Sequence, residues 1–339
     1  MKDRARNCTQ DATPRQGRSS LKPGWSPWRV FLGLALGLIL LAVAARGIEP
    51  GQVWAGLARA NPTWIALAFL SVLLTTAAKI GRWQGLFPRT RQPNLLPLGK
   101  ALLVGQLFNA LLPARVGDVV RAYMVGTEAG ISRVMVLGTV AAEKAFDVLF
   151  LLLCGGLAAI VVPLPPWLGL PLTVGTVGGI LLFLLALFGP EQSLPEWVER
   201  GIQRLPWESG AWLLGVSQRI LVGLAALRES RMALLACVWS ASIWTLAAGT
   251  NYLLFLAFKL HLPYVAALSL LVLLHVGVAP PSSPGRLGVF HALTVLGLEA
   301  FGVDRSSGLA YATVLHAIVY LPQIVPGIAI LGLNRRRAQ

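Results

Sequence analysis

The segment KALLVGQLFNALLPARVGDVVRAYMVGTE, residues 100–128, decides how the chain is folded. It begins with an apolar run at 100–112 that is too short to cross a bilayer, because a transmembrane helix needs ~20 mostly apolar residues. The sequence PARVG at 113–117 ends that run, and a second short helix is expected at 118–128. The segment is therefore predicted to enter the membrane and return, as a broken re-entrant hairpin.

The same pattern recurs in the second half of the chain. An apolar run at 264–279 is followed by the interruption PPSSPGRLG at 280–288 and by a return helix that reaches Phe301. The motif P-x-R-x-G occurs at 113–117 and again at 284–288 in one register, because 284 − 113 and 288 − 117 both equal 171. The chain is therefore predicted to contain two repeats, each with a broken hairpin.

Long apolar runs around the hairpins predict three full spans in each half. Because three crossings end on the opposite membrane face, the second half would start on the face opposite to the first. The repeats are then inverted about an axis in the membrane plane. The tripeptides Gly-Ile-Ser at 130–132 and Gly-Val-Asp at 302–304 also correspond, 172 residues apart. The predicted fold class is all-α, a polytopic integral membrane protein with about six full transmembrane helices and two broken re-entrant hairpins as inverted repeats. The expected spans are 28–45, 62–81, 132–162, 167–189, 232–258 and 308–333.

Basic residues predict the orientation, because Lys and Arg near the spans are retained on the cytoplasmic side. They gather in the N-terminal tail, after the second span at Lys79, Arg82 and Lys100, and in the C-terminal run 335–337. We therefore expect a multi-pass protein of the cell inner (plasma) membrane, with both termini in the cytoplasm and the turn at 163–166 outside. The expected domains are a basic disordered tail at 1–27, a transmembrane domain at 28–333 with repeats at about 28–162 and 167–333, and a basic tail at 334–339.

The composition excludes most soluble functions. Of the 339 residues, 55% are hydrophobic and 13% are charged, against ~25% charged in a typical soluble domain, so the bilayer must act as the solvent. The net charge of +15 is expected to attract anionic lipid headgroups and not nucleic acid. The four histidines lack metal-site spacing and no catalytic motif has a fitting context, so we expect no metal, no cofactor and no enzyme activity.

The first hairpin tip is a candidate anion site. A helix that begins there would present free N–H groups and the positive end of its dipole, which suit a phosphate. Next to Gly117, Arg115, Asp118 and Arg121 follow at i, i+3 and i+6 on one helix face, and arginine suits bidentate phosphate binding. The alternative is a surface hairpin whose arginines touch lipid headgroups while Asp118 only pairs with Arg121.

Three charged residues lie inside the third span. Glu143 and Asp147 share a helix face, and Lys144 reaches Asp147 at i, i+3. A charge in a span costs ~3 kcal/mol on insertion scales, so such groups normally face the bundle interior and pair. Two interpretations stay open: a salt-bridge latch to Arg115 or Arg121, and a direct role with a substrate or a proton.

The second hairpin supplies the remaining candidate residues. Arg286 is the counterpart of Arg115, and two histidines lie on the return helix and in the last span. The histidines are expected to be hydrogen-bonded interior groups, some of them titrating near pH ~6.5. The candidates of this half are Pro284, Gly285, Arg286, Gly288, His291 and His316.

Three motifs in order carry a family resemblance. GQLFNALLPARVGDVVRAY at 105–123 is similar to a P-x-R-x-G-[DE]-x-x-R pattern, EKAFD at 143–147 to E-[RK]-x-x-D, and PGRLGVF at 284–290 is the third motif. Over roughly 28–333 the chain resembles the lysylphosphatidylglycerol synthase transmembrane region, also called the flippase-like domain family. The resemblance implies a lipid transporter or flippase, which in different members handles aminoacylated phospholipids, polyprenyl-phosphate glycolipids or related anionic lipids.

Two positions depart from the family pattern. His291 stands where the family usually has an acidic residue, and His316 stands where the last span often has arginine. The two changes together are consistent with one lost ion pair. The sequence ends at Gln339, so we expect no soluble aminoacyl-transferase domain, and synthase activity is not implied.

The function expected from these features is movement of an anionic phospholipid or a polyprenyl-phosphate-linked lipid across the inner membrane. Alternating exposure of a cavity between the inverted halves would carry it out. One alternative is an accessory or enzymatic subunit of glycolipid or aminoacyl-lipid synthesis, and another is a membrane scaffold. An enzyme predicts convergent acid/base or metal groups, which the sequence does not show. A scaffold needs no ionisable groups in its spans, and several are present.

Overall fold

The computed structural model of the chain describes residues 35, 39, 42, 46–112, 116–161, 174, 176–181, 196–203, 230–279 and 284–337. Over these residues the chain is helical, with two short 3-10 turns and no strand, which confirms the all-α fold class. Several predicted features lie outside the described residues. They are most of the first and fourth spans, the tail at 1–27, the tip residues 113–115 and 280–283 and the turn at 163–166.

The helices follow the predicted order of spans and hairpins. Three of them, α3, α10 and α13, are long and apolar enough to cross a membrane, while α6 is 29 residues long and holds the three charged residues of the third span. The short helices α4, α5, α11 and α12 form the two hairpins. The bounds are α2 Pro50–Arg59, α3 Pro62–Gly85, η1 Arg89–Arg91, α4 Leu95–Leu111, α5 Val116–Glu128, α6 Arg133–Val161, α8 Glu196–Gln203, α10 Ser230–Ala257, α11 Tyr264–Gly277, η3 Pro284–Arg286, α12 Val289–Glu299 and α13 Arg305–Arg337.

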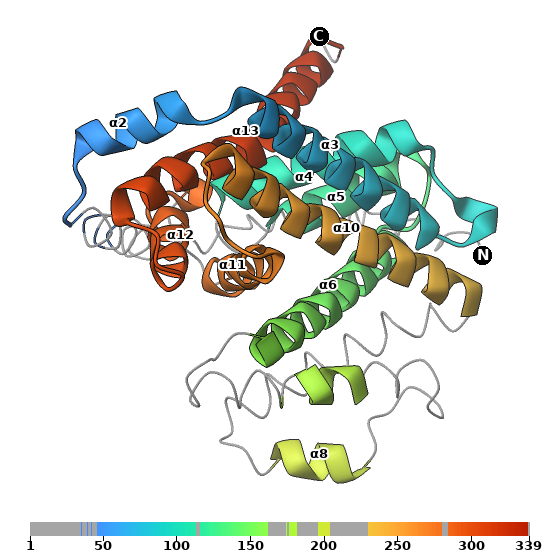
Figure 1. Cartoon of the computed structure of the whole chain (residues 1–339). Helices are drawn as coiled ribbons and strands as arrows, with labels where there is room; N and C mark the ends of the chain where they lie inside the picture. The colour runs from blue at the N-terminus through green and yellow to red at the C-terminus, as the bar shows by residue number, and fades with distance from the viewer. Residues whose placement is uncertain are drawn as a thin grey trace, which may run out of the picture.

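One segment differs from the sequence-based expectation. The spans predicted at 28–45 and 62–81 leave residues 46–61 as a connection, yet this connection contains the helix α2, which packs against α13 (Figure 1). Pro50 begins this helix, where a missing N–H costs nothing because the first N–H groups of a helix have no intrahelical partner. Gly56 packs against Ala310 of α13, whereas Trp54 on the outer side is exposed. The helix is too short to span, so a search for full spans does not reveal it.

The helices α3 and α10 run antiparallel and side by side (Figure 1). The Asn61 N–H at the start of α3 donates to the Ala257 carbonyl at the end of α10, at 2.9 Å. Near the other end of the pair, Arg82 of α3 reaches Ser240 of α10. The sequence predicts α3 and α10 as the second span of each half, and their opposite directions are those expected of inverted repeats.

The two halves end their hairpins in the same way. Gly130 after α5 and Gly302 after α12 both adopt a positive φ, of 63° and 80°, which a residue without Cβ tolerates. The next residue closes the turn in both cases, at 3.2 Å, from Ile131 N–H to Gly126 O and from Val303 N–H to Leu298 O. The long helices then begin at Arg133 and Arg305, and 305 − 133 is again 172. The repeat boundaries themselves stay a prediction.

The first hairpin is held together by glycines. A Cβ on Gly117 of α5 would collide with the Gly105 carbonyl of α4, so these two backbones cross in direct contact. In turn, α4 packs against α13 and also touches η3 at the second hairpin. The helix that leads to the first tip therefore meets the second tip, as expected when two broken helices surround one site.

Candidate functional site

The site is built around Arg121 of α5, which is almost fully buried. Its Nη1 and Nη2 donate to Oε1 and Oε2 of Glu143 on α6, at 3.2 and 2.6 Å. The guanidinium carbon also lies 4.0 Å from the centre of the Trp83 ring. Asp118, one turn earlier on α5, is 3.6 Å from the Arg121 Nη1. Arginine is required here because only its planar fork can make this bidentate contact while its face stacks on an aromatic ring.

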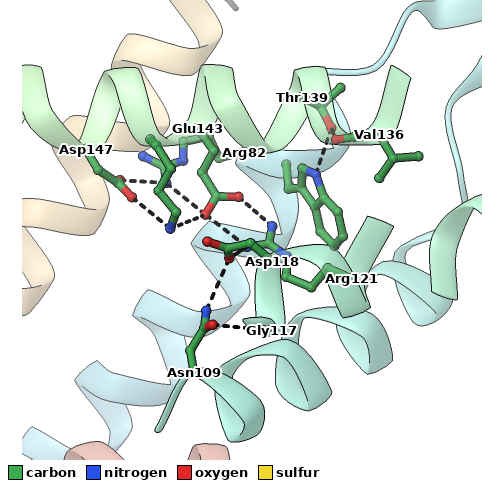
Figure 2. A network of polar contacts seen from close by, with 11 residues as sticks. Arg82, Asn109, Gly117, Asp118, Arg121, Val136, Thr139, Glu143 and Asp147 are labelled. Atoms are coloured by element: carbon green, nitrogen blue, oxygen red, sulfur yellow. Dashed lines mark hydrogen bonds and ion pairs between the residues drawn. The ribbon is translucent and has the colours of Figure 1, made fainter. Parts of the chain in front are cut away.

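Asn109 connects the two helices of the first hairpin. Its Oδ1 accepts the Gly117 N–H at 2.8 Å, and its Nδ2 donates to Asp118 Oδ1 at 3.2 Å (Figure 2). The sequence pattern predicts free N–H groups at the start of the return helix, but the Gly117 N–H is already used by Asn109. Arg115, the other predicted ligand of this tip, lies outside the described residues.

Arg82 of α3 is the second buried arginine, and the sequence analysis missed it as a site residue. Its Nη2 lies 2.8 Å from Asp147 Oδ1 and 4.0 Å from Glu143 Oε1, and its side chain is 1% exposed. The sequence pattern placed Arg82 in the cytoplasmic basic collar, and that assignment is wrong, because α3 continues to Gly85 and its Arg82 faces the bundle. Glu143 and Asp147 needed two strong cation partners, a signal that could have indicated Arg82.

Lys144 and Asp147 form the accessible edge of the same cluster. Lys144 Nζ lies 3.4 Å from Glu143 Oε1 and 3.7 Å from Asp147 Oδ2, so the predicted i, i+3 pair exists. Asp147 nevertheless lies closer to Arg82 than to Lys144. The side chains of Lys144 and Asp147 are 36% and 33% exposed, against 5% for Glu143. In Figure 2 the side chains of Glu143 and Asp147 project from α6 toward Arg121 and Arg82, their ion-pair partners on α5 and α3.

The second hairpin tip has an unusual backbone. Gly285, Arg286 and Gly288 have positive φ values of 67°, 56° and 85°, and only residues 287 and 288 separate η3 from α12. His316 of α13 hydrogen-bonds through Nε2 to the Gly285 carbonyl, at 2.9 Å. The Arg286 guanidinium hydrogen-bonds to the Tyr320 hydroxyl. The last span therefore fixes the second tip, whose Pro284 side chain lies outside the described residues.

His291 and His316 are neighbours in space. Their ring centres are 5.0 Å apart, and His316 also stacks on Tyr320 at 4.4 Å. The two positions that depart from the family pattern are therefore in contact, as the interpretation of one lost ion pair requires. The Nδ1 atom of His291 is buried and has no hydrogen-bond partner among the described residues.

The predicted residues thus fall into two groups. The first contains Asp118, Arg121, Glu143, Lys144 and Asp147, joined by Arg82. The second contains Gly285, Arg286, His291 and His316. His275 of α11 hydrogen-bonds to the Leu271 carbonyl and lies against the Trp244 ring, and it is within electrostatic range of Lys79, Asp147 and Arg286. Within the described part of the chain, no cluster of His, Cys, Asp and Glu could hold a metal.

Comparisons with known proteins agree with a membrane domain. The family described as the lysylphosphatidylglycerol synthase TM region matches residues 30–327. The chain is 24% identical over 310 residues to a UPF0104 membrane protein of Methanothermobacter thermautotrophicus, which covers 84% of this chain and 89% of that protein. It is 25% identical over 342 residues to glycosyltransferase AglD of Haloferax volcanii, with 90% of this chain covered. The match spans only 54% of AglD, about half its length. No solved structure matches.

Proposed function

Since this chain belongs to the lysylphosphatidylglycerol synthase TM region family, we propose that it moves an anionic lipid or lipid-linked headgroup across the cell inner membrane. The family and its relatives make it a multi-pass membrane protein of lipid or glycolipid metabolism or transport. In our proposal the chain is a transporter without catalysis of its own, and both its termini lie in the cytoplasm. Its ligand is an anionic phospholipid or a polyprenyl-phosphate-linked lipid.

The observation that carries this proposal is an excess of positive charge in the cluster that α3, α5 and α6 form at membrane depth. Four cations, Lys79, Arg82, Arg121 and Lys144, surround three carboxylates, and Arg286 of the second tip is electrostatically linked to them through His275. Each charge at membrane depth costs ~3 kcal/mol on insertion scales, so such groups are normally retained for a substrate or ion pathway. An anionic headgroup would balance the excess.

The arrangement of the helices supports movement as well as binding. The antiparallel pair α3 and α10 holds the two halves in opposite directions, and α4 touches η3 where the hairpins meet. In inverted-repeat transporters, broken helices at the repeat interface form the binding site and the halves rock around it. The charged cluster lies about 15 Å along α6 from its start at Arg133, since a helix rises ~1.5 Å per residue. A headgroup bound there would lie within the bilayer, between its two faces.

Reconstitution tests the proposal directly. Vesicles with the purified chain should move fluorescent phosphatidylglycerol between leaflets faster than fluorescent phosphatidylcholine, as measured by reduction of the outer-leaflet dye. Protein-free vesicles give the background rate. A rate equal to that background, or equal rates for both lipids, would rule out a transporter selective for anionic headgroups. Reporter fusions to both termini in cells test the orientation.

A second candidate function is a membrane module for glycolipid synthesis. The observation that favours it is the match to a protein named glycosyltransferase AglD, of which this chain spans about half. In that case the purified chain should transfer label from a nucleotide sugar to a polyprenyl phosphate, alone or with a catalytic partner. Transfer without movement of lipid would favour this candidate over the transporter.

A further inference from the structure

The charged cluster has two layers of different exposure. Arg82, Arg121 and Glu143 are buried, with side-chain exposures of 1%, 3% and 5%. Lys144 and Asp147 are about a third exposed, and Lys79 lies one helical turn before Arg82 on α3 and is partly exposed. A ligand reaching this site therefore meets the second layer first. Arg82 and Arg121 both lie behind that layer. They differ in their partners, because Glu143 accepts from both terminal nitrogens of Arg121, which the sequence pattern placed at the ligand.

Arg82 has an unused hydrogen-bond donor although it is buried. Its Nη1 donates to the Ser240 hydroxyl at 3.0 Å. Its Nε and Nη2 have no aligned hydrogen-bond acceptor within the described part of the chain, despite the short ion-pair distance from Nη2 to Asp147. A buried donor without an acceptor costs ~1–3 kcal/mol, and more for a charged group. Nη2 still has the Asp147 carboxylate at 2.8 Å, so Nε is the Arg82 donor that is left for an acceptor oxygen of a ligand.

The charges of the cluster indicate how much negative charge the ligand carries. The ion-paired residues are balanced: Arg82, Arg121 and Lys144 face Asp118, Glu143 and Asp147. Lys79 has no ion pair within the described part of the chain, although it interacts electrostatically with Asp147 and Glu143. Lys79 therefore adds one positive charge that no carboxylate of the cluster balances. One monoanion would neutralise that charge.

We propose that Lys79, Arg82 and Lys144 bind the anionic group of the ligand, a phosphodiester monoanion, and that Arg121 and Glu143 hold these residues in place. This inference rests on the proposed function, and it assigns to the ligand two cations of α3 that sequence reasoning left in the basic collar. A phosphodiester carries one negative charge and two unesterified oxygens. One oxygen accepts from the unused Nε donor of Arg82, and the other accepts from the ammonium groups of Lys79 and Lys144.

Binding by purified full-length protein in detergent tests the assignment without requiring transport. The probes are dihexanoylphosphatidylglycerol, which carries one net negative charge, and dihexanoylphosphatidylcholine, which is zwitterionic. Lys79→Gln and Lys144→Gln should each weaken binding of the phosphatidylglycerol probe by roughly tenfold or more, the effect of one lost charge-assisted contact. The matched control is Lys100→Gln on α4, a lysine of the same half that forms none of the ion pairs of the cluster. Its binding should equal that of the unchanged protein.

The outcomes separate this inference from the proposed function. Unchanged phosphatidylglycerol affinity in folded Lys79→Gln, with lipid movement intact in the parent protein, overturns the site and leaves the transporter standing. Loss of affinity in Lys79→Gln, with a parent protein that binds but does not move lipid, supports the site and overturns the transporter. Equal affinity of the parent protein for both probes, or no binding of either, overturns the monoanion assignment. Melting temperatures of all variants show that each is folded.

Discussion

The two halves of the molecule differ in charge at three equivalent positions. In the first half, Arg82, Arg121 and Glu143 form the buried centre of the charged cluster. At the offset of 172 residues that relates Gly130 to Gly302, one more than the offset of the P-x-R-x-G motifs, the second half has leucines, which belong to one apolar cluster around α10 and α13. These are Leu254, Leu293 and Leu315.

Contacts within each half show that these positions are equivalent. A Cβ on Gly105 would meet the Arg121 side chain, and a Cβ on Gly277, 172 residues later, would meet the Leu293 side chain. Likewise the indole N–H of Trp83 on α3 donates a hydrogen bond to the Thr139 hydroxyl on α6, at 3.0 Å. Their counterparts, Phe255 of α10 and Tyr311 of α13, are in ring contact at 5.5 Å. Each half therefore brings the same three helices together in the same register.

The second half shows that three helices can pack in this register without buried charges. Replacing a buried ion pair by well-packed apolar residues is often neutral or stabilising by ~1–4 kcal/mol. The second half makes that replacement naturally, since Leu254 and Leu315 are fully buried. Ions retained in the first half against this cost are therefore best explained by a ligand, which the following variants test.

The largest effect is expected from breaking the charged centre on one side. Arg121→Leu copies the second half at one position but leaves Glu143 without its bidentate partner. An uncompensated buried charge costs ~3–5 kcal/mol, so the free energy of unfolding should fall by about that amount. Denaturant unfolding in detergent measures it, with Val119→Leu on the exposed side of α5 as control. A loss below about 1 kcal/mol would mean that Glu143 is not held by Arg121.

A smaller effect is expected from filling the glycine contacts. Gly117→Ala places a methyl group against the Gly105 backbone carbonyl, whereas Gly277→Ala meets only the end of the Leu293 side chain. Overpacking typically costs ~1–3 kcal/mol, and a flexible side chain can move while a backbone cannot. Gly117→Ala should therefore be the more destabilising of the two by melting temperature. The reverse order would contradict the close crossing of α4 and α5.

The residues that precede α6 and α13 should contribute to stability with a different dependence on pH. Burial alone would raise the pKa of Asp304, but hydrogen bonds from the Ser307 N–H and hydroxyl and the Ser306 N–H outweigh it and lower that pKa. The stabilisation by Asp304 is therefore present above the unfolded pKa of ~3.9 and lost as pH falls through the lower folded value.

Asp304→Ala should consequently cost about 1 kcal/mol at pH 7, the usual value of an N-cap, and less as pH falls below ~4. Ser132, the counterpart before α6, accepts the Val136 N–H with its backbone carbonyl, so Ser132→Ala should cost less than ~0.5 kcal/mol at every pH. Thermal unfolding of both variants at several pH values measures the difference. Equal pH profiles would disprove the role of the Asp304 carboxylate.

The smallest change in stability is expected when the whole centre is replaced. The triple variant Arg82→Leu, Arg121→Leu, Glu143→Leu gives the first half the residues of the second. Its free energy of unfolding should lie within about 1 kcal/mol of the parent protein, or above it, since no charge is left at the buried centre. The two carboxylates at its edge keep a partner each, Asp147 the Lys144 ammonium and Asp118 the Asn109 amide. Preference for phosphatidylglycerol over phosphatidylcholine should nevertheless disappear. A triple variant as unstable as Arg121→Leu would show that the centre is structural.

Local properties of the sequence determined much of this protein. Hydropathy and chain length predicted the spans that α3, α10 and α13 form, because burying apolar side chains in lipid depends on composition along one helix. Proline and glycine marked both hairpins, because they interrupt helices wherever they stand. The recurrence of Pro113 at Pro284 revealed the repeat, and the i, i+3 spacing of Lys144 and Asp147 predicted their pairing. The three motifs also identified the family that the comparison confirms.

Only the tertiary structure decided which helices supply the partners. Arg82 lies near the end of an apolar run, where a lysine or arginine of the cytoplasmic collar would look the same. Its burial against Asp147 and Ser240 depends on how α3 crosses α6 and α10, which no local pattern contains. The same holds for the neighbouring rings of His291 and His316, on α12 and α13. The spacing of residues along a helix predicts which side chains share a face. Which neighbouring helix packs against that face depends on the packing of the whole bundle.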